Sequence, residues 1–280
     1  MILHNPAIDW LTLTAFDANE TIRLANISGK YGTGEPQVQK ILGYSGRQWR
    51  GIFFGVGVQN DMRHVMLRAS GEVADTVMEE LVGYGSGRCT RIDLQITVYL
   101  PLSYSARLLA DRLRMTKWKH YKRMVELIEG NPAGFDTVYI GSRKSERFIR
   151  IYVKKAGVSK YLRFEVEYKG DFAQGVYDTI CARGKEAVCA TLAQEVNELP
   201  EVTFPGMETI RERIAVYEAT RIPRVERVPD DNPSLMWLLR QVDPAIRRLI
   251  HDHDTGVDVR KLVAKWHELG QEIDNPRDLR

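Results

Sequence analysis

Residues 161–168, with the sequence YLRFEVEY, alternate strictly between two kinds of side chain. A β-strand sends successive side chains to opposite faces of a sheet, so this period of two predicts a strand. One face is apolar, and the other carries Arg163, Glu165 and Glu167. Two acids on one strand face are typical of a divalent-cation site or an acid/base pair. A solvated face with a salt bridge explains the same pattern, so both interpretations stay open at this point.

Two other segments repeat this design. Residues 89–99 (CTRIDLQITVY) and 148–154 (FIRIYVK) alternate in the same way, with aliphatic side chains on one face. Their other faces carry Arg91, Asp93 and Gln95 in the first segment, and Arg150, Tyr152 and Lys154 in the second. If the three strands share one antiparallel sheet, their polar faces merge. We therefore predict an α+β fold: a central, largely antiparallel sheet with helices on one face, an open catalytic face and a helical C-terminal extension.

The other periodicities extend this domain. They predict strands at 9–16, 52–58, 64–69 and 137–140, and helices at 38–42, 72–81, from Ser103 to about Met115, from Gly170 and from Glu186 onward. Residues 221–233 (RIPRVERVPDDNP) are rich in proline and charge, as linkers are. We predict a catalytic and DNA-binding domain at 1–220, a linker at 221–233 and a helical extension at 234–280. No repeat with the period of a solenoid is visible.

Composition narrows the choice of compartment and partner. The net charge of the 280 residues is only +3, so binding to nucleic acid would have to come from a local patch. The three cysteines show no CxxC spacing, which favours a reduced, intracellular protein. No signal peptide and no apolar run of membrane-spanning length is visible. We expect a soluble, cytoplasmic protein that does not bind a membrane.

A local basic patch lies between residues 107 and 123, where Asp111 is the sole acid. Aromatic side chains are interleaved with the basic ones. Such a run suits phosphate contacts combined with base stacking, although a solvated helix face is the alternative. We predict DNA contacts from Arg112, Arg114, Lys117, Trp118, Lys119, Lys122 and Arg123.

The merged polar faces would hold three acids within a basic rim. Carboxylates on rigid strands suit Mg²⁺ or Mn²⁺, and a cationic rim suits a phosphodiester. A metal ion polarises a phosphoryl oxygen and stabilises the leaving group. The nucleophile would then be water or a side chain such as tyrosine.

The order of these segments resembles the Rep_trans family, the rolling-circle replication initiators of small plasmids and phages and their relatives among the relaxases of conjugative elements. The resemblance rests on TVYIGSRKS at 137–145, IRIYVK at 149–154 and LRFEVE at 162–167. TRIDL at 90–94 is similar to a strand of that family, and DWL at 9–11 to its opening strand. The resemblance covers residues 8–200.

The resemblance implies an enzyme that nicks and rejoins DNA with the help of a divalent metal. A tyrosine attacks a phosphodiester at the replication origin, stays linked to the 5′ phosphate and releases a 3′ hydroxyl that primes synthesis. The substrate would be single-stranded or cruciform DNA. The chain has no P-loop, so a host helicase is an expected partner. The oligomeric state is left open, with a homodimer as one option.

The family's site residues map onto this chain by motif. Asp93 and Glu165 match its acids, Arg143 and Lys144 its basic turn, and Lys154 the lysine that closes the preceding strand. Thr97 stands where relatives often have another acid, so metal ligation would rest on Asp93, Glu165 and Glu167. Arg150 and Arg163 share the polar faces and complete the predicted DNA contacts.

Three tyrosines compete as the nucleophile. Plasmid relatives carry it on the helix after the Arg-x-Glu strand, where Tyr177 lies two positions beyond the aligned place. Tyr168 alternates onto the apolar face of its strand, which favours a core role. We rank Tyr177 first, Tyr168 second and Tyr152 third.

Two other functions are compatible with the same segments. A sequence-specific DNA-binding protein without nicking activity is favoured by Thr97 in place of an acid. An RNA-binding sheet would carry stacking aromatics on its open face. The polar faces carry acids instead, which argues against RNA.

Overall fold

A computed structural model describes residues 5–59, 62–83, 85–101, 103–118, 124–130, 136–156, 158–201, 204–217 and 219. The chain divides into two units, Met1–Val225 and Glu226–Arg280. The predicted linker and C-terminal extension lie outside the described residues, as do Lys119, Lys122 and Arg123. Everything below concerns the first unit.

The first unit is built on a ten-stranded antiparallel sheet, which confirms the predicted α+β class. Its order is β2-β3-β4-β5-β1-β6-β10-β9-β8-β7. The strands are β1 Ala7–Ala15, β2 Gln37–Ile41, β3 Tyr44–Trp49, β4 Ile52–Gln59, β5 Met62–Ser70, β6 Arg88–Tyr99, β7 Val125–Ile128, β8 Thr137–Ile140, β9 Arg147–Ala156 and β10 Ser159–Lys169. The helices are α1 Ala18–Tyr31, α2 Glu72–Leu81, α3 Ala106–Met115, α4 Gly170–Arg183, α5 Lys185–Glu198 and α6 Met207–Ile214.

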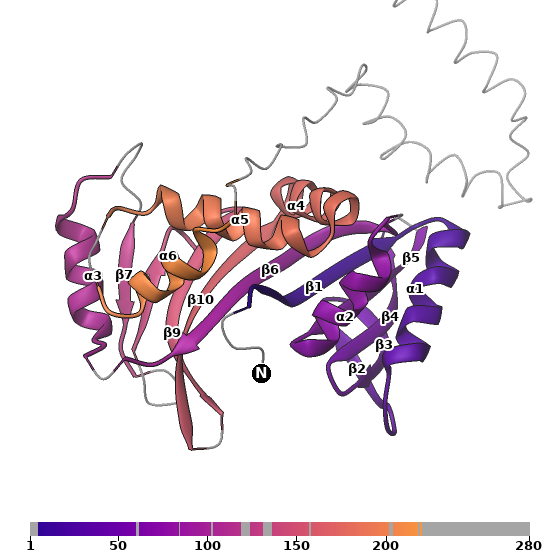
Figure 1. The fold of residues 1–280 in the computed structure, drawn as a ribbon. Coiled ribbons are helices and arrows are strands. Elements are labelled where there is room, and N and C mark those ends of the chain that lie inside the picture. Colours follow the sequence, from indigo (N-terminus) through magenta and orange to yellow (C-terminus); the bar gives the residue numbers. More distant parts are fainter. Residues whose placement is uncertain are drawn as a thin grey trace, which may run out of the picture. The chain divides into compact units, whose positions relative to one another are not determined.

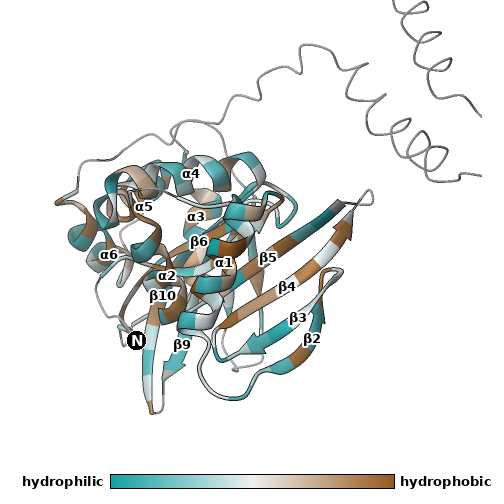
Figure 2. Ribbon diagram, turned by 90° about the vertical axis from the view of Figure 1, so that its right-hand side faces the viewer, coloured by the Kyte–Doolittle hydropathy of each residue, from teal (hydrophilic) through white to brown (hydrophobic). Residues whose placement is uncertain are grey.

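The described helices cover one face of this sheet. Figure 1 shows α3 beside β7 at one end, α4, α5 and α6 along β6 and β10, and α1 and α2 at the other end. Leu94, Ile151 and Phe164 are fully buried against these helices. In Figure 2, hydrophobic stretches run along β4 and β5, whereas β3, next to the edge strand β2, is hydrophilic. The aliphatic faces predicted for β6, β9 and β10 therefore form the core, and their polar faces lie together on the other side.

The sheet consists of two halves with the same order of elements. Strand, helix, four strands and helix run from β1 to α2, and the same series runs from β6 to α4. The halves join through β1 and β6, the two central strands of the sheet. Even the turns into α2 and α4 agree, because Gly71 and Gly170 both have positive φ, 62° and 56°, which glycine adopts without strain.

The predicted helix at 38–42 is wrong, because these residues form β2 and the turn that follows it. Leu42 and Gly43 both have positive φ, 51° and 87°. Two such residues in a row make the tight turn that suits a β-hairpin, so Gln37–Ile41 pairs with Tyr44–Trp49.

The observed bounds of the other predicted helices and strands differ less from the prediction. The cap of α3 is Ser105, whose hydroxyl accepts a hydrogen bond from the Leu108 backbone N–H, and not Ser103. Strands β3 and β7 and helix α1 had not been predicted; α1 begins after Asp17, whose carboxylate accepts from the Glu20 backbone N–H.

Among the described helices, none is long and apolar enough to cross a membrane.

Candidate active site on the open face

Strands β6, β10 and β9 are neighbours, and their register brings the predicted acids together. Glu167 lies opposite Asp93 on β6. Glu165 lies between Gln95 of β6 and Arg150 of β9. Because side chains at paired positions of an antiparallel sheet share a face, all three acids meet on the open side.

These acids are buried and paired with cations. Asp93, Glu165 and Glu167 are only 1%, 3% and 6% exposed. Arg91 donates from Nε to Asp93 Oδ1 at 2.9 Å and from Nη2 to Asp93 Oδ2 at 2.6 Å. Its Nη2 also lies 2.9 Å from Glu167 Oε2, whose partner oxygen Oε1 is 2.6 Å from Lys169 Nζ. This is a buried ion-pair network, where breaking one pair is costly.

Arg150 stands at the centre of this network. Its Nη2 lies 2.9 Å from Asp93 Oδ2 and 3.3 Å from Glu167 Oε2, and it also donates to Glu165 Oε1. One nitrogen thus contacts an oxygen of each acid. Its Nε is buried and has no hydrogen-bond partner among the residues that the structure describes.

Tyr152 is the candidate nucleophile that shares this face. Its hydroxyl donates to Glu165 Oε2 at 2.7 Å. Lys154 follows two residues later on the same face of β9. Beside them, Arg163 donates from Nε to Thr97 Oγ1 at 3.0 Å and pairs through Nη1 with Asp9 Oδ1 at 2.8 Å.

Burial is the largest single influence on the pKa of each of these groups. It raises the pKa of Asp93 to about 7, although Arg91 and Arg150 oppose the shift. Burial also acts to raise the pKa of Glu167, but Lys169, Arg91 and Arg150 outweigh it and hold that pKa below its ordinary value. Burial, followed by the charge of Glu165, raises the pKa of the Tyr152 phenol. Burial and then the charge of Arg163 lower the pKa of Lys154.

The other two tyrosines lie on the opposite side of the sheet from the acids. The Tyr177 hydroxyl accepts from the Ser86 backbone N–H at 2.7 Å and donates to the Ser86 carbonyl at 3.0 Å. The Tyr168 hydroxyl donates to Glu195 Oε1 at 2.9 Å, beneath the helices. Both side chains belong to the hydrophobic core, with exposures of 2% and 0%. The structure therefore brings neither phenol to the acids, because α4 packs against the aliphatic face.

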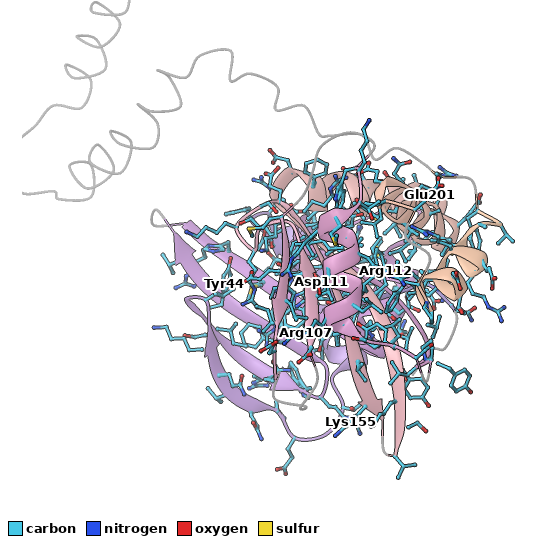
Figure 3. All side chains as sticks on the ribbon, turned by 90° about the vertical axis from the view of Figure 1, so that its left-hand side faces the viewer. Tyr44, Arg107, Asp111, Arg112, Lys155 and Glu201 are labelled. Carbon is cyan, nitrogen blue, oxygen red and sulfur yellow. The ribbon has the colours of Figure 1, made fainter. Side chains whose placement is uncertain are left out.

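The predicted basic contacts fall into separate groups. Arg112, Arg114 and Lys117 are exposed on or just after α3, which packs beside β7 and β8 on the helical side of the sheet (Figure 3, where Arg112 is labelled). Trp118 is 7% exposed, and its indole N–H donates to the Leu113 carbonyl, so its ring packs in the core and is not displayed for stacking.

The turn between β8 and β9 provides the second group. Arg143 and Lys144 are exposed there. The Arg143 guanidinium lies 5.1 Å from the centre of the Tyr139 ring. Tyr139 pairs with Arg150 across β8 and β9 and so shares the open face. The Arg143 guanidinium therefore lies on the side of the sheet that carries the acids, unlike the cations of α3.

Residue-level prediction missed several partners of the acids. Arg91 and Lys169 pair with Asp93 and Glu167, and Asp9 pairs with Arg163. Alternation along 89–99 already placed Arg91 on the polar face. Nothing in the sequence signalled that β1 lies beside β6, which brings Asp9 of β1 to Arg163 of β10. A cavity of about 710 Å³ also adjoins the site, with Lys154 and Arg163 in its lining.

The predicted metal ligands do not fit a metal ion in this arrangement. Within the described residues, no group of three or more His, Cys, Asp or Glu side chains is placed to hold one. The reason lies in the geometry above, because the position between the three carboxylates is filled by the Arg150 guanidinium.

Comparison with known proteins adds no family or relative to these observations: no protein-family model matches the chain, and no curated protein sequence matches it.

Proposed function

We propose that the chain is a rolling-circle replication initiator that nicks and rejoins origin DNA, with Tyr152 as its nucleophile. The observation that carries the proposal is the 2.7 Å hydrogen bond from the Tyr152 hydroxyl to Glu165 on the acid-bearing open face. A tyrosine nucleophile needs a base within hydrogen-bond reach, and Glu165 provides one. Tyr152 thereby replaces Tyr177 as our first choice.

The side chains divide the chemistry between them. Glu165 Oε2 accepts the phenol proton while the Tyr152 oxygen bonds to phosphorus. The bond from phosphorus to the 3′ oxygen then breaks, leaving the 5′ phosphate on the tyrosine. Lys154 supplies a proton to the departing 3′ oxygen, which its lowered pKa favours. Rejoining runs these steps in reverse.

The cations of the open face suit the charge of the reaction. Arg150 and Arg163 offer guanidinium donors where negative charge develops on the phosphoryl oxygens. Arg143 and Lys144 extend this positive rim over the β8–β9 turn. No step of the proposal runs through Mg²⁺ or Mn²⁺, because Arg150 fills the place between the carboxylates. Single-stranded or cruciform origin DNA, with a host helicase for strand separation, remains the proposed setting.

A covalent adduct tests the proposal directly. The protein would be incubated with a pool of single-stranded oligonucleotides of random sequence, labelled at either the 3′ or the 5′ end. The label should follow the protein through denaturing electrophoresis only from the 3′ end, because the tyrosine holds the 5′ phosphate of the downstream fragment. Peptide mapping should place the adduct on Tyr152.

Variants of two tyrosines provide the matched comparison. Tyr152→Phe should abolish the adduct while the fold is kept. Tyr177→Phe should leave the adduct in place and cost about 1–3 kcal/mol of stability, because it strands the buried Ser86 N–H. An adduct that survives Tyr152→Phe would overturn the assignment.

A DNA-binding protein without nicking activity is the second candidate. One observation favours it: the three acids are neutralised by arginine and lysine, as in a purely structural ion-pair network. This function predicts that wild-type protein binds the same oligonucleotides without forming any adduct.

A further inference from the structure

The contacts of Arg150 define its role more closely than those of a general DNA-binding residue. A divalent cation bound by three carboxylates lies between their oxygens. Arg150 Nη2 already lies there, 2.9 Å from Asp93, 3.3 Å from Glu167 and in hydrogen-bond contact with Glu165. A metal ion and this guanidinium therefore exclude each other by position.

The charge balance of the site also disfavours a metal ion while Arg150 is in place. When all three acids are ionised, they face three cations: Arg91, Arg150 and Lys169. The three carboxylates are almost completely buried. Adding two positive charges to a buried cluster that is already balanced is unfavourable. Removing Arg150 leaves a net negative charge there, which attracts a cation.

Arg150 is also more accessible than its neighbour Arg163. The Arg150 side chain is 20% exposed, and within the described part of the chain its Nε has no hydrogen-bond partner. The Arg163 side chain is only 3% exposed and is fixed through Nε and Nη1 to Thr97 and Asp9. A phosphate approaching the open face can therefore engage Arg150, since phosphate accepts two parallel hydrogen bonds from a guanidinium.

We propose that Arg150 is a built-in counter-cation, which excludes Mg²⁺ and Mn²⁺ from Asp93, Glu165 and Glu167 until a DNA phosphate draws it away. The order of binding follows: DNA first, metal second. The proposal rests on the proposed function only for its DNA step. The exclusion of metal by Arg150 is a property of the protein alone.

The first test measures Mn²⁺ binding by electron paramagnetic resonance, without DNA. Arg150→Gln should bind Mn²⁺ at least ~10-fold more tightly than the wild type, the size of an ordinary coupling between sites. Arg143→Gln is the matched control, because Arg143 is exposed in the turn before the same strand and its guanidinium lies over the Tyr139 ring. Equal Mn²⁺ affinity in wild type and Arg150→Gln would overturn the exclusion.

Circular dichroism checks the fold of each variant. Should Arg150→Gln unfold, the wild type decides by itself: saturating single-stranded oligodeoxythymidylate should raise its Mn²⁺ affinity by the same ~10-fold. Bound oligonucleotide with no change in Mn²⁺ affinity would overturn the displacement. An oligonucleotide that does not bind would instead count against the proposed function, while the Arg150→Gln comparison still decides the exclusion.

Discussion

The two halves of the sheet share a topology and a register but carry different side chains on the open face. Strands β1 and β6 are related by a two-fold symmetry of their pairing. Interchanging the two strands puts the pair Trp10↔Asp93 in the place of the pair Thr12↔Arg91. The alignment extends to the pairs of β5 with β1 and to the equivalent pairs of β10 with β6. It places Thr12, Met66 and Arg68 where the second half has Asp93, Glu165 and Glu167. At these three positions the first half has no carboxylate.

The same alignment of β4 with β9 puts Gly55 and Gly57 at the positions of Arg150 and Tyr152. Aromatic contacts replace the ion pairs there. The rings of Phe16 and His64 stack at 5.3 Å, and the ring of Tyr44 meets His64 at 4.8 Å.

The first half is therefore an internal control for the second. It builds the same five strands and two helices without the acids, so the architecture does not require them. Burying charged groups carries a desolvation cost even when they are paired. Side chains that bear this cost in only one of two equivalent places are better explained by a task than by folding, which supports the proposed active site.

Replacing Glu165 with the residue at its equivalent position tests this contrast most strongly. Glu165→Met should remove adduct formation and destabilise the protein by about 3–5 kcal/mol, the range for deleting one partner of a buried ion pair. Met66→Leu, in the first half, conserves volume and should cost less than ~1.5 kcal/mol. Urea denaturation measures both. Equal losses of stability in the two variants would mean that the ion pairs of Glu165 contribute nothing beyond ordinary packing.

The pH dependence of stability should also distinguish the halves. The first half has the uncharged Thr12 at the position equivalent to Asp93. The pKa of Asp93 is raised from an ordinary 3.8 to about 7, so the folded protein holds this proton more tightly than the unfolded chain. The contribution of Asp93 to stability must then fall as pH rises through that interval. Asp93→Asn should flatten the dependence of unfolding free energy on pH. An unaltered slope would show that Asp93 stays ionised throughout.

The smallest expected effect concerns the rim of the acid-bearing half. Replacing Arg143 and Lys144 with Gln should lower the salt dependence of single-strand binding by about 0.7 in log–log slope for each lost contact. Lys40→Gln, on the exposed edge strand β2, should leave the slope unchanged. Fluorescence anisotropy over a range of salt concentrations measures both. If Lys40→Gln lowered the slope as much as the replacements of Arg143 and Lys144 do, the DNA would contact both halves of the sheet.

Much of this contrast was accessible from sequence, because alternation assigns each strand residue to a face. The apolar positions of 92–98, 149–153 and 162–166 correctly identified the core side, and the polar positions identified the open side. Alternation was also sufficient to put Tyr152 beside the acids. It was ranked third because the resemblance to the Rep_trans family favoured the helix that carries Tyr177.

Register and long-range pairing could not be predicted in this way. Whether Arg150 faces Glu165, Glu167 or neither depends on how β9 slides against β10, and a shift of one residue would move every side chain to the other face. Trp118 lies in a basic run but folds back onto Leu113, a contact that composition cannot signal. The duplication of the fold was equally hidden, because the equivalent positions carry unrelated residues.

The glycine at position 57 also has a consequence for stoichiometry. With Tyr152 as nucleophile, the half that lacks its counterpart cannot form a second phosphotyrosine link. Each chain would then hold one DNA end at a time. A replication cycle that must open the origin and later release a closed circle would need either a second chain or turnover of the first link before the next cut.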